Sequence, residues 1–217
     1  MSKITSVEPQ KKNPHRFNIY LDSEFAFGAD EDLVVDHRLV AGKVIDQTEL
    51  EKLLFEAEVG KLMERMYRLF NIRQRSEKEV RDYFRVKSQE SRVKGKEEIS
   101  QLVIDAVIET LKKKGMVNDL EFAKAWVQAR RKSKQKGNKI LKVELYQKGI
   151  AKEITDEVLG GESNQEELAK LALEKKMRVW KNLPTQEFKK KAFEFLMRRG
   201  FEYELVKEIV EKIGKKG

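Results

Sequence analysis

Residues 141–149 have the sequence LKVELYQKG, and residues 192–200 have the sequence AFEFLMRRG. In both stretches two apolar residues stand four positions apart, and a basic residue followed by glycine comes three positions later. Apolar residues recur five, nine and ten positions after each glycine, as Ile154, Val158 and Leu159 in one copy and Leu205, Ile209 and Val210 in the other. This pattern predicts a helix that ends at the basic-glycine pair and a following helix that packs back against it.

The same pattern occurs nearer the start of the chain as VRDYFRVKS at residues 80–88, with Ser88 in place of the glycine. A segment rich in Lys, Glu and Ser follows at 89–98, before an apolar helical pattern that begins at Ile99. With the helical pattern that precedes each copy, the repeat predicts three modules of three helices. Because one such module buries little apolar surface, we expect a mainly α fold whose tandem three-helix repeats stack as an elongated curved array.

Charge divides the chain near residue 58. Residues 1–57 hold 7 basic and 11 acidic residues, a net charge of −4, whereas residues 58–217 hold 39 basic and 26 acidic residues, a net charge of +13. Because the apolar periodicity changes at the same place, we predict four parts. They are a small acidic β/α extension at 1–57 and three-helix modules at 58–118, 119–162 and 163–217.

The acidic first part has the pattern of a small antiparallel sheet. Apolar residues cluster on either side of Asp22 and Ser23, which predicts a two-residue hairpin turn, and Ile4 and Val7 indicate an earlier strand. Helical patterns follow at 33–39 and 49–55. We expect the strands to pack against these helices, because three short strands are not stable alone.

The residues needed for the commonest catalytic and metal centres are missing. The chain has no cysteine, and His15 and His37 lack the spacing of a metal-binding pair. It also lacks the glycine-rich loops that bind nucleotides. We therefore expect no enzyme activity, no cofactor and no metal. The lack of cysteine and of a long apolar segment favours a cytoplasmic protein that does not bind a membrane.

The basic residues are more informative, because they cluster. Nine of them lie between Arg130 and Lys152, a window whose one acidic residue is Glu144. Such a cluster favours an acidic partner, either nucleic acid or an acidic protein surface, although a solvated cationic face has the same composition. Trp126 and Trp180 fall on apolar helical faces, so we expect them in the core rather than stacked on bases.

Three ordered blocks of sequence carry a family resemblance. They are RQRSEKEV at 73–80, GMVNDLEFAKAWVQAR at 115–130 and KGNKILKVELYQKGI at 136–150. In order and spacing they resemble the RecX family, bacterial regulators of the RecA recombinase. The resemblance extends over residues 60–213 and includes the triple repeat.

The resemblance implies a non-enzymatic regulator. RecX proteins bind along the groove of the RecA filament on single-stranded DNA and limit its growth, its ATP hydrolysis and its recombinase activity, which damps recombination, DNA repair and the SOS response. On this basis we expect the RecA filament and nonspecific single- or double-stranded DNA as partners. The candidate contacts are the clustered basic residues Arg73, Arg75, Arg130, Arg131, Lys132, Lys136, Lys139, Lys142, Lys148, Lys176, Arg178, Lys190, Arg198 and Arg199.

Two other hypotheses fit the basic clusters. In one, the chain is a nonspecific single-stranded nucleic-acid-binding protein that acts without a recombinase; in the other, it is a helical scaffold for an acidic protein. The chain also departs from the family pattern, which usually has glycine where Ser88 stands and a proline before Gly137. The acidic extension occurs in some relatives only. We expect it to pack on the first module or to serve assembly, and a position facing RecA is the third option.

Overall fold

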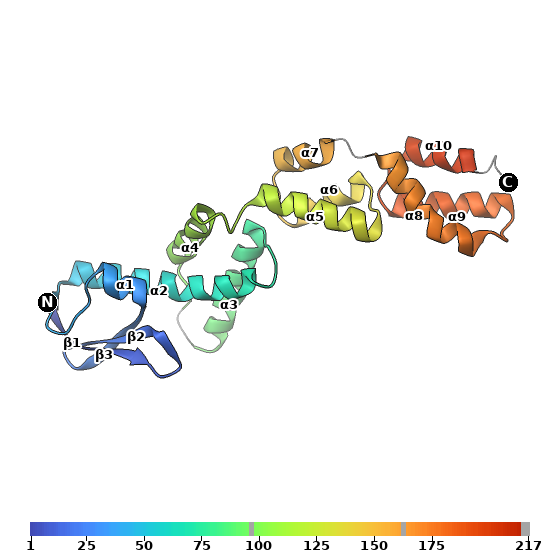
Figure 1. Ribbon diagram of the computed structural model, residues 1–217. Helices are drawn as coiled ribbons and strands as arrows, with labels where there is room; N and C mark the ends of the chain where they lie inside the picture. The colour runs from blue at the N-terminus through green and yellow to red at the C-terminus, as the bar shows by residue number, and fades with distance from the viewer. Residues whose placement is uncertain (96–97, 162–163, 214–217) are drawn as a thin grey trace. The chain divides into compact units, whose positions relative to one another are not determined.

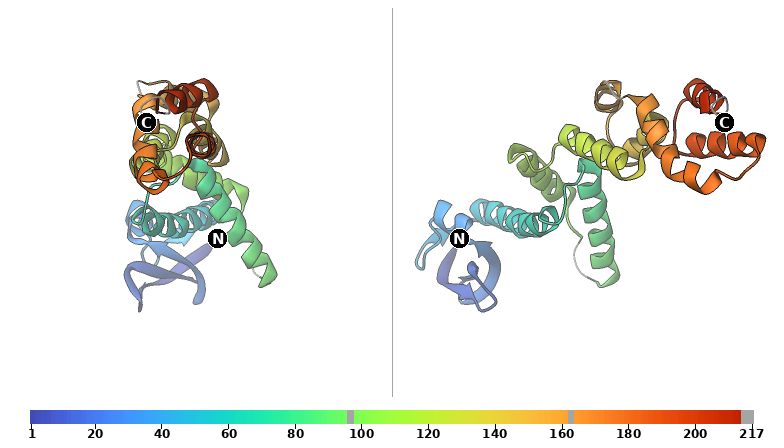
Figure 2. Two further views of the ribbon diagram at one scale, coloured as in Figure 1. Left: turned by 90° about the vertical axis from the view of Figure 1, so that its right-hand side faces the viewer. Right: turned by 45° about the vertical axis from the view of Figure 1, so that its right-hand side comes forward.

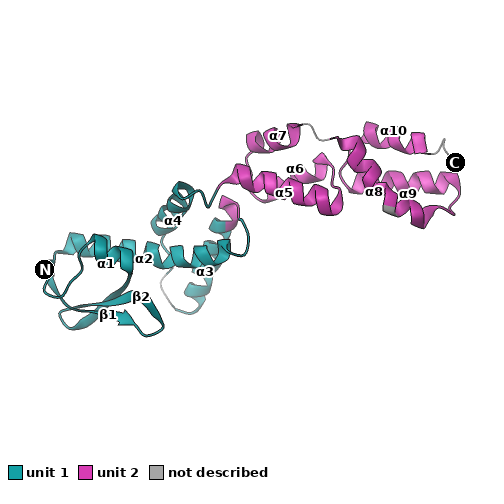
Figure 3. Ribbon diagram, in the orientation of Figure 1, with its two compact units in different colours: residues 1–74, 80–117 teal, residues 75–79, 118–217 magenta. Residues whose placement is uncertain are grey.

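The computed structural model describes residues 1–95, 98–161 and 164–213. This part of the chain is mostly helical and has a small antiparallel sheet at the N-terminus (Figure 1). The chain forms two compact units, a first unit of residues 1–74 and 80–117 and a second unit of residues 75–79 and 118–217 (Figure 3). The predicted fold class, mainly α with three-helix repeats and a small β-containing N-terminal part, is confirmed.

The N-terminal sheet has the strand order β3-β2-β1-β4, with antiparallel neighbours. Its strands are β1 (Ser2–Gln10), β2 (Asn13–Leu21), β3 (Glu24–Asp30) and β4 (Val44–Ile45). Asp22 and Ser23 form the predicted hairpin turn with positive φ values of 49° and 74°, as a type I′ turn requires. The two-residue β4 is too short to leave a pattern in the sequence. Helix α1 (Glu31–Asp36) follows the hairpin, and the Asp30 side chain caps its N-terminus.

Helix α2 (Gln47–Phe70) takes part in both hydrophobic cores of the first unit. Leu53 and Ala57 pack with the buried residues of the sheet, whereas Met63 and Met66 pack with the two helices that follow. Figure 2 shows α2, drawn in cyan, running from the blue sheet region to the green helices. One continuous helix therefore crosses the predicted boundary between residues 57 and 58, and the domain limits remain predictions.

Helices α3 (Glu77–Val93) and α4 (Gln101–Lys113) complete the second of these cores, in which Phe84 is fully buried. The prediction that the second helix of the first module ends at Lys87 and Ser88 is wrong, because α3 continues to Val93. Ser88 lacks the freedom of glycine to adopt the left-handed conformation that ends a helix. An ion pair of 2.8 Å between Lys87 and Glu90 lies on the added turn.

The second unit contains two consecutive three-helix bundles. The first consists of α5 (Asp119–Lys134), α6 (Asn138–Gln147) and α7 (Lys152–Gly160), and the second of α8 (Gln165–Trp180), α9 (Thr185–Arg198) and α10 (Tyr203–Ile213). Leu141 and Leu145 are fully buried in the first bundle, as Leu196 is in the second. Gly149 and Gly200 have φ values of 78° and 83° just after α6 and α9, as the repeat predicts.

Helices α6 and α9 differ at their N-terminal ends. In the repeat alignment Gly137 corresponds to Phe188, but Gly137 caps the start of α6 whereas Phe188 lies inside α9. The Phe188 amide donates to the carbonyl oxygen of Pro184 at 2.9 Å, as in any helical turn. The second helix of the last bundle therefore begins about one turn earlier than that of the preceding bundle.

Phe84 provides a test of the core of the first unit. The change Phe84→Ala should lower the free energy of unfolding by about 3–5 kcal/mol, because it removes a fully buried ring. The matched change Val86→Ala, at an exposed position of the same helix, should alter it by less than about 0.5 kcal/mol. Urea unfolding followed by circular dichroism measures both values, and equal effects would contradict the packing described for α3.

Candidate functional site

Glu144 is the centre of a charged cluster between α5 and α6. Its Oε2 atom accepts hydrogen bonds from Trp126 Nε1 at 2.9 Å and from Arg130 Nε at 3.1 Å, and its Oε1 atom pairs with the Lys136 ammonium group. The Arg130 guanidinium also lies over the Trp126 ring, 4.3 Å from its centroid. The one acidic residue of the basic window thus joins two cations and an indole.

The surroundings of Glu144 keep its carboxylate ionised. Burial alone would raise its pKa, but hydrogen bonds from Lys136 and Trp126, together with the positive charges of Lys136 and Arg130, hold the pKa below its ordinary value. Trp126 is half-buried at the edge of the bundle core, where it stacks on Phe122 with ring centroids 5.8 Å apart. The indole therefore lies beside the core rather than inside it, and cations cover its outer face.

Lys148 connects this cluster to the start of α3, all within the second unit. Its ammonium group lies 5.0 Å from the centroid of the Trp126 ring and 2.5 Å from Glu79 Oε1. The buried Ser76 hydroxyl donates to the Lys148 carbonyl oxygen at 2.7 Å and accepts a hydrogen bond from the Glu79 amide. The RQRSEKEV block therefore contains a helix cap whose serine and glutamate both bind the end of α6.

A second junction joins the start of α6 to the end of α9. The Gly137 amide donates to the Arg199 carbonyl oxygen at 2.8 Å, and the Lys139 amide donates to the Gly200 carbonyl oxygen at 3.0 Å. A Cβ atom on Gly137 would overlap the Gly200 carbonyl group. In both junctions the start of a second helix binds the basic-glycine end of the next copy, so the same kind of contact occurs twice within the second unit.

Several predicted contacts are thus engaged within the protein. Arg130, Lys136 and Lys148 pair with carboxylates, and Lys139 and Lys142 form exposed ion pairs of 2.8 Å with Glu202 and Asp156. The sequence does not reveal these pairings, because the partners of Lys148 and Lys139 lie far away along the chain. The one available signal is that Ser76 and Gly137 occupy equivalent positions of the repeat.

Three predicted arginines are half-buried. Arg75 Nε, Arg131 Nε and Arg199 Nη1 are buried and have no hydrogen-bond partner among the residues that the structure describes. Burial lowers the pKa of Arg131 and of Arg199. Arg131 donates to Asn138 Oδ1 at 3.0 Å, and the Arg199 guanidinium packs 4.7 Å from the centroid of the Phe195 ring.

The remaining predicted contacts are exposed. Lys132, Arg178, Lys190 and Arg198 form no ion pair within the described ranges. Lys176 is exposed and lies 6.0 Å from the centroid of the Trp180 ring. Arg73 is exposed and donates to the Gln74 carbonyl oxygen at 2.8 Å. These side chains are the ones whose charge is most accessible to a partner.

The described residues contain no group of His, Cys, Asp and Glu side chains arranged to hold a metal ion. Within the same ranges, no helix combines the length and apolar character needed to cross a membrane. The geometry described above instead defines a tandem helical-repeat protein with an N-terminal sheet, in which charged contacts fix the modules and leave other cations exposed.

Comparisons with known proteins specify this class further. Three family models match: the regulatory protein RecX N-terminal domain over residues 2–46, the RecX second three-helix domain over 118–159 and the RecX third three-helix domain over 164–210. Proteins named regulatory protein RecX are similar in sequence. The one from Bacillus pumilus strain SAFR-032 is 35% identical over 214 residues and that from Bacillus subtilis strain 168 is 34% identical over 215, each match covering 98% of this chain and 78% of the relative. The chain belongs to the RecX family of regulatory proteins.

Solved structures share the fold. A crystal structure of regulatory protein RecX superposes with a TM-score of 0.72 at 24% identity, covering 97% of this chain and 100% of the other. The crystal structure of RecX from Lactobacillus salivarius superposes with a TM-score of 0.60 at 22% identity, covering 71% of this chain and 96% of the other.

Glu144 gives a pH-dependent test of the charged cluster. Because the pKa of Glu144 is lower in the folded chain than its ordinary value of 4.5, its ionised form stabilises the fold above that pH, and the contribution is lost as pH falls through the folded pKa. At neutral pH the change Glu144→Gln should lower the free energy of unfolding by about 1–3 kcal/mol. The difference from the wild type should shrink in acid, and Glu153→Gln, at an exposed position, is the control. A difference that stays constant in acid would argue against the cluster.

Gly137 tests the junction with α9. The change Gly137→Ala should destabilise the second unit by about 1–3 kcal/mol, because the new methyl group overlaps the Gly200 carbonyl group. Gly160→Ala is the matched control, since a Cβ atom there meets nothing within 4 Å. Thermal unfolding compares the two variants. Equal stability of both would show that α6 and α9 do not meet through their backbones.

Proposed function

We propose that the chain regulates a RecA recombinase by binding the RecA filament on single-stranded DNA. Bound along the filament groove, it would inhibit or modulate filament growth, ATP hydrolysis and recombinase activity, and so damp recombination and the SOS response. This role requires no catalytic group in the chain. The protein would act in the cytoplasm, where the recombinase acts on the chromosome.

The observation that carries this proposal is membership of the RecX family of regulatory proteins over nearly the whole chain. The junction between the two bundles of the second unit supports it, because it holds modules that carry exposed cations at a fixed spacing. A filament is itself a repeat of identical protomers, so many modest charged contacts would add up through their spacing. Such binding should weaken as salt increases.

The exposed cations are the best candidates for partner contacts. Lys132, Arg178, Lys190 and Arg198 are free of ion pairs within the described part of the second unit, so a partner would not have to break an internal interaction to bind them. Arg130 and Lys136, in contrast, would have to leave Glu144. We therefore assign partner binding to the four exposed cations. Arg130 and Lys136 instead stabilise the fold through Glu144.

A test is the DNA-dependent ATPase of the cognate RecA protein, measured with increasing amounts of this chain. We expect the rate to fall, and expect the double change Arg178→Glu with Arg198→Glu to weaken the effect roughly tenfold. The unfolding free energy should change little, because exposed charges contribute little to stability. The change Lys113→Glu with Lys114→Glu is the charge-matched control. An ATPase rate unchanged at saturating wild-type protein would overturn inhibition.

Binding to bare single-stranded DNA separates this function from nonspecific nucleic-acid binding. Fluorescence anisotropy at moderate salt should show tighter binding to a preformed RecA filament than to the oligonucleotide alone. A preference for the bare oligonucleotide would favour the nucleic-acid-binding alternative.

A further inference from the structure

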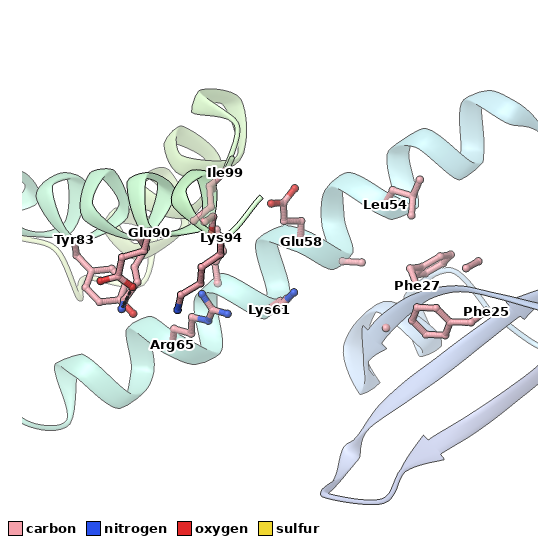
Figure 4. A pocket seen from close by; sticks show the side chains of 16 residues that line it. Phe25, Phe27, Leu54, Glu58, Lys61, Arg65, Tyr83, Glu90, Lys94 and Ile99 are labelled. Atoms are coloured by element: carbon pink, nitrogen blue, oxygen red, sulfur yellow. Dashed lines mark hydrogen bonds and ion pairs between the residues drawn. The ribbon is translucent and has the colours of Figure 1, made fainter. Parts of the chain in front are cut away.

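A groove of about 780 Å³ lies within the first unit, where β3, α2 and α3 line it (Figure 4). We call it the first-unit groove and define it by Phe25 on β3, Leu54, Lys61 and Arg65 on α2, and Tyr83 and Lys94 on and after α3. None of the basic residues assigned above to filament binding lines it. Its two ends differ in chemistry.

One end of the first-unit groove is apolar. Phe25 is 59% exposed and Leu54 is 42% exposed, although both are large hydrophobic side chains. Figure 4 shows Phe25 and Phe27 on β3 at the same end of the groove as Leu54. This end offers an anchor point for an apolar side chain of a partner.

The groove follows the edge of β3. Four consecutive residues, Phe25 to Gly28, line it, although successive side chains of a strand point to opposite faces. β3 is also the terminal strand of the sheet in the described ranges. A terminal strand has unpaired backbone groups along its outer edge, which pair readily with an extended peptide.

The other end of the groove is cationic. Lys61, Arg65 and Lys94 form no ion pair in the part of the chain that the structure describes. Glu90 lies beside them, but its carboxylate is paired with Lys87 at 2.8 Å. With Glu58 as the other acidic residue of the lining, the groove has an excess of positive charge at the end away from Phe25.

The length of the groove sets the spacing of a complementary partner. Leu54 and Arg65 are eleven residues apart on α2, which at 1.5 Å per residue is roughly 16 Å. An extended chain covers that distance in about five residues. We infer that the first-unit groove binds an extended peptide segment with an apolar side chain at one end and acidic side chains about five residues away.

A peptide fits the lining better than a nucleic acid does. Glu58 and Glu90 lie in the same groove as the cations, and a nucleic-acid backbone would bring regularly spaced phosphates close to them. A peptide can place its acidic side chains opposite Arg65 and Lys94 alone.

Fluorescence anisotropy with the full chain tests this inference. The probe is a fluorescein-labelled peptide with Leu and Phe, a spacer of about three serines and a run of Asp, matched to the spacing above. It should bind saturably, and the same peptide with Lys in place of Asp should not. Arg65→Glu, Lys94→Glu and Phe25→Ser should each weaken binding roughly tenfold. Lys113→Glu, outside the groove, should have no effect.

Three outcomes would overturn the inference. They are no saturable binding of the acidic peptide, equal binding by the wild type and by Lys94→Glu, and tighter binding of an oligothymidine that Lys94→Glu abolishes. Because Lys94 is exposed, its substitution leaves the fold intact and keeps the comparison valid. The probe contains no recombinase, so its result is independent of the ATPase test of the proposed function.

Discussion

The amides that begin α6 are paired with the carbonyl groups that end α9, and the arrangement of the second unit depends on this backbone pairing. Helix ends carry backbone groups that lack partners within the helix. Here one end supplies donors and the other acceptors, and glycine at positions 137 and 200 permits the close approach. The start of α3 and the end of α6 meet in a related way, with the Ser76 hydroxyl as donor in place of a backbone amide. These contacts join α6 to α9 and the start of α3 to α6 within this unit.

The helices and their ends could be predicted from sequence because local rules determine them. The four-residue spacing of Leu141 and Leu145 and the glycines after α6 and α9 act within one or two turns. The repeat wrongly predicts a helix end at Lys87 and Ser88, because serine lacks the left-handed freedom by which glycine ends a helix. The continuity of α2 across residues 57 and 58 could not be predicted, because the net charge of the sequence changes there while the backbone stays helical.

The candidate site was harder to predict, because the chemistry of a cation depends on what faces it. Lys148 and Arg198 are equivalent as residues of a basic cluster, yet Lys148 binds Glu79, which is 69 positions away, and Arg198 stays exposed. In the sequence Glu144 is the one acidic residue of a basic window. In the structure its carboxylate binds Trp126, Arg130 and Lys136. The number of basic residues therefore overstates the cations that this protein presents to a partner, because several of them are paired with carboxylates within the fold.

The contact between modules has a direction, with a helix start on one side and a basic-glycine end on the other. α3 runs past Ser88 and ends at the basic-glycine pair Lys94 and Gly95, where Gly95 has a φ of 66°. At the equivalent of Gly137, in contrast, the last bundle has Phe188 inside a helix, with its amide already bonded. The last module therefore lacks the helix start that this contact with a further copy would need. Head-to-tail contacts that do not close on themselves produce open fibres. Because a head-to-tail contact needs both of its sides, the missing helix start in the last module protects the repeat from polymerising through the interaction that builds it.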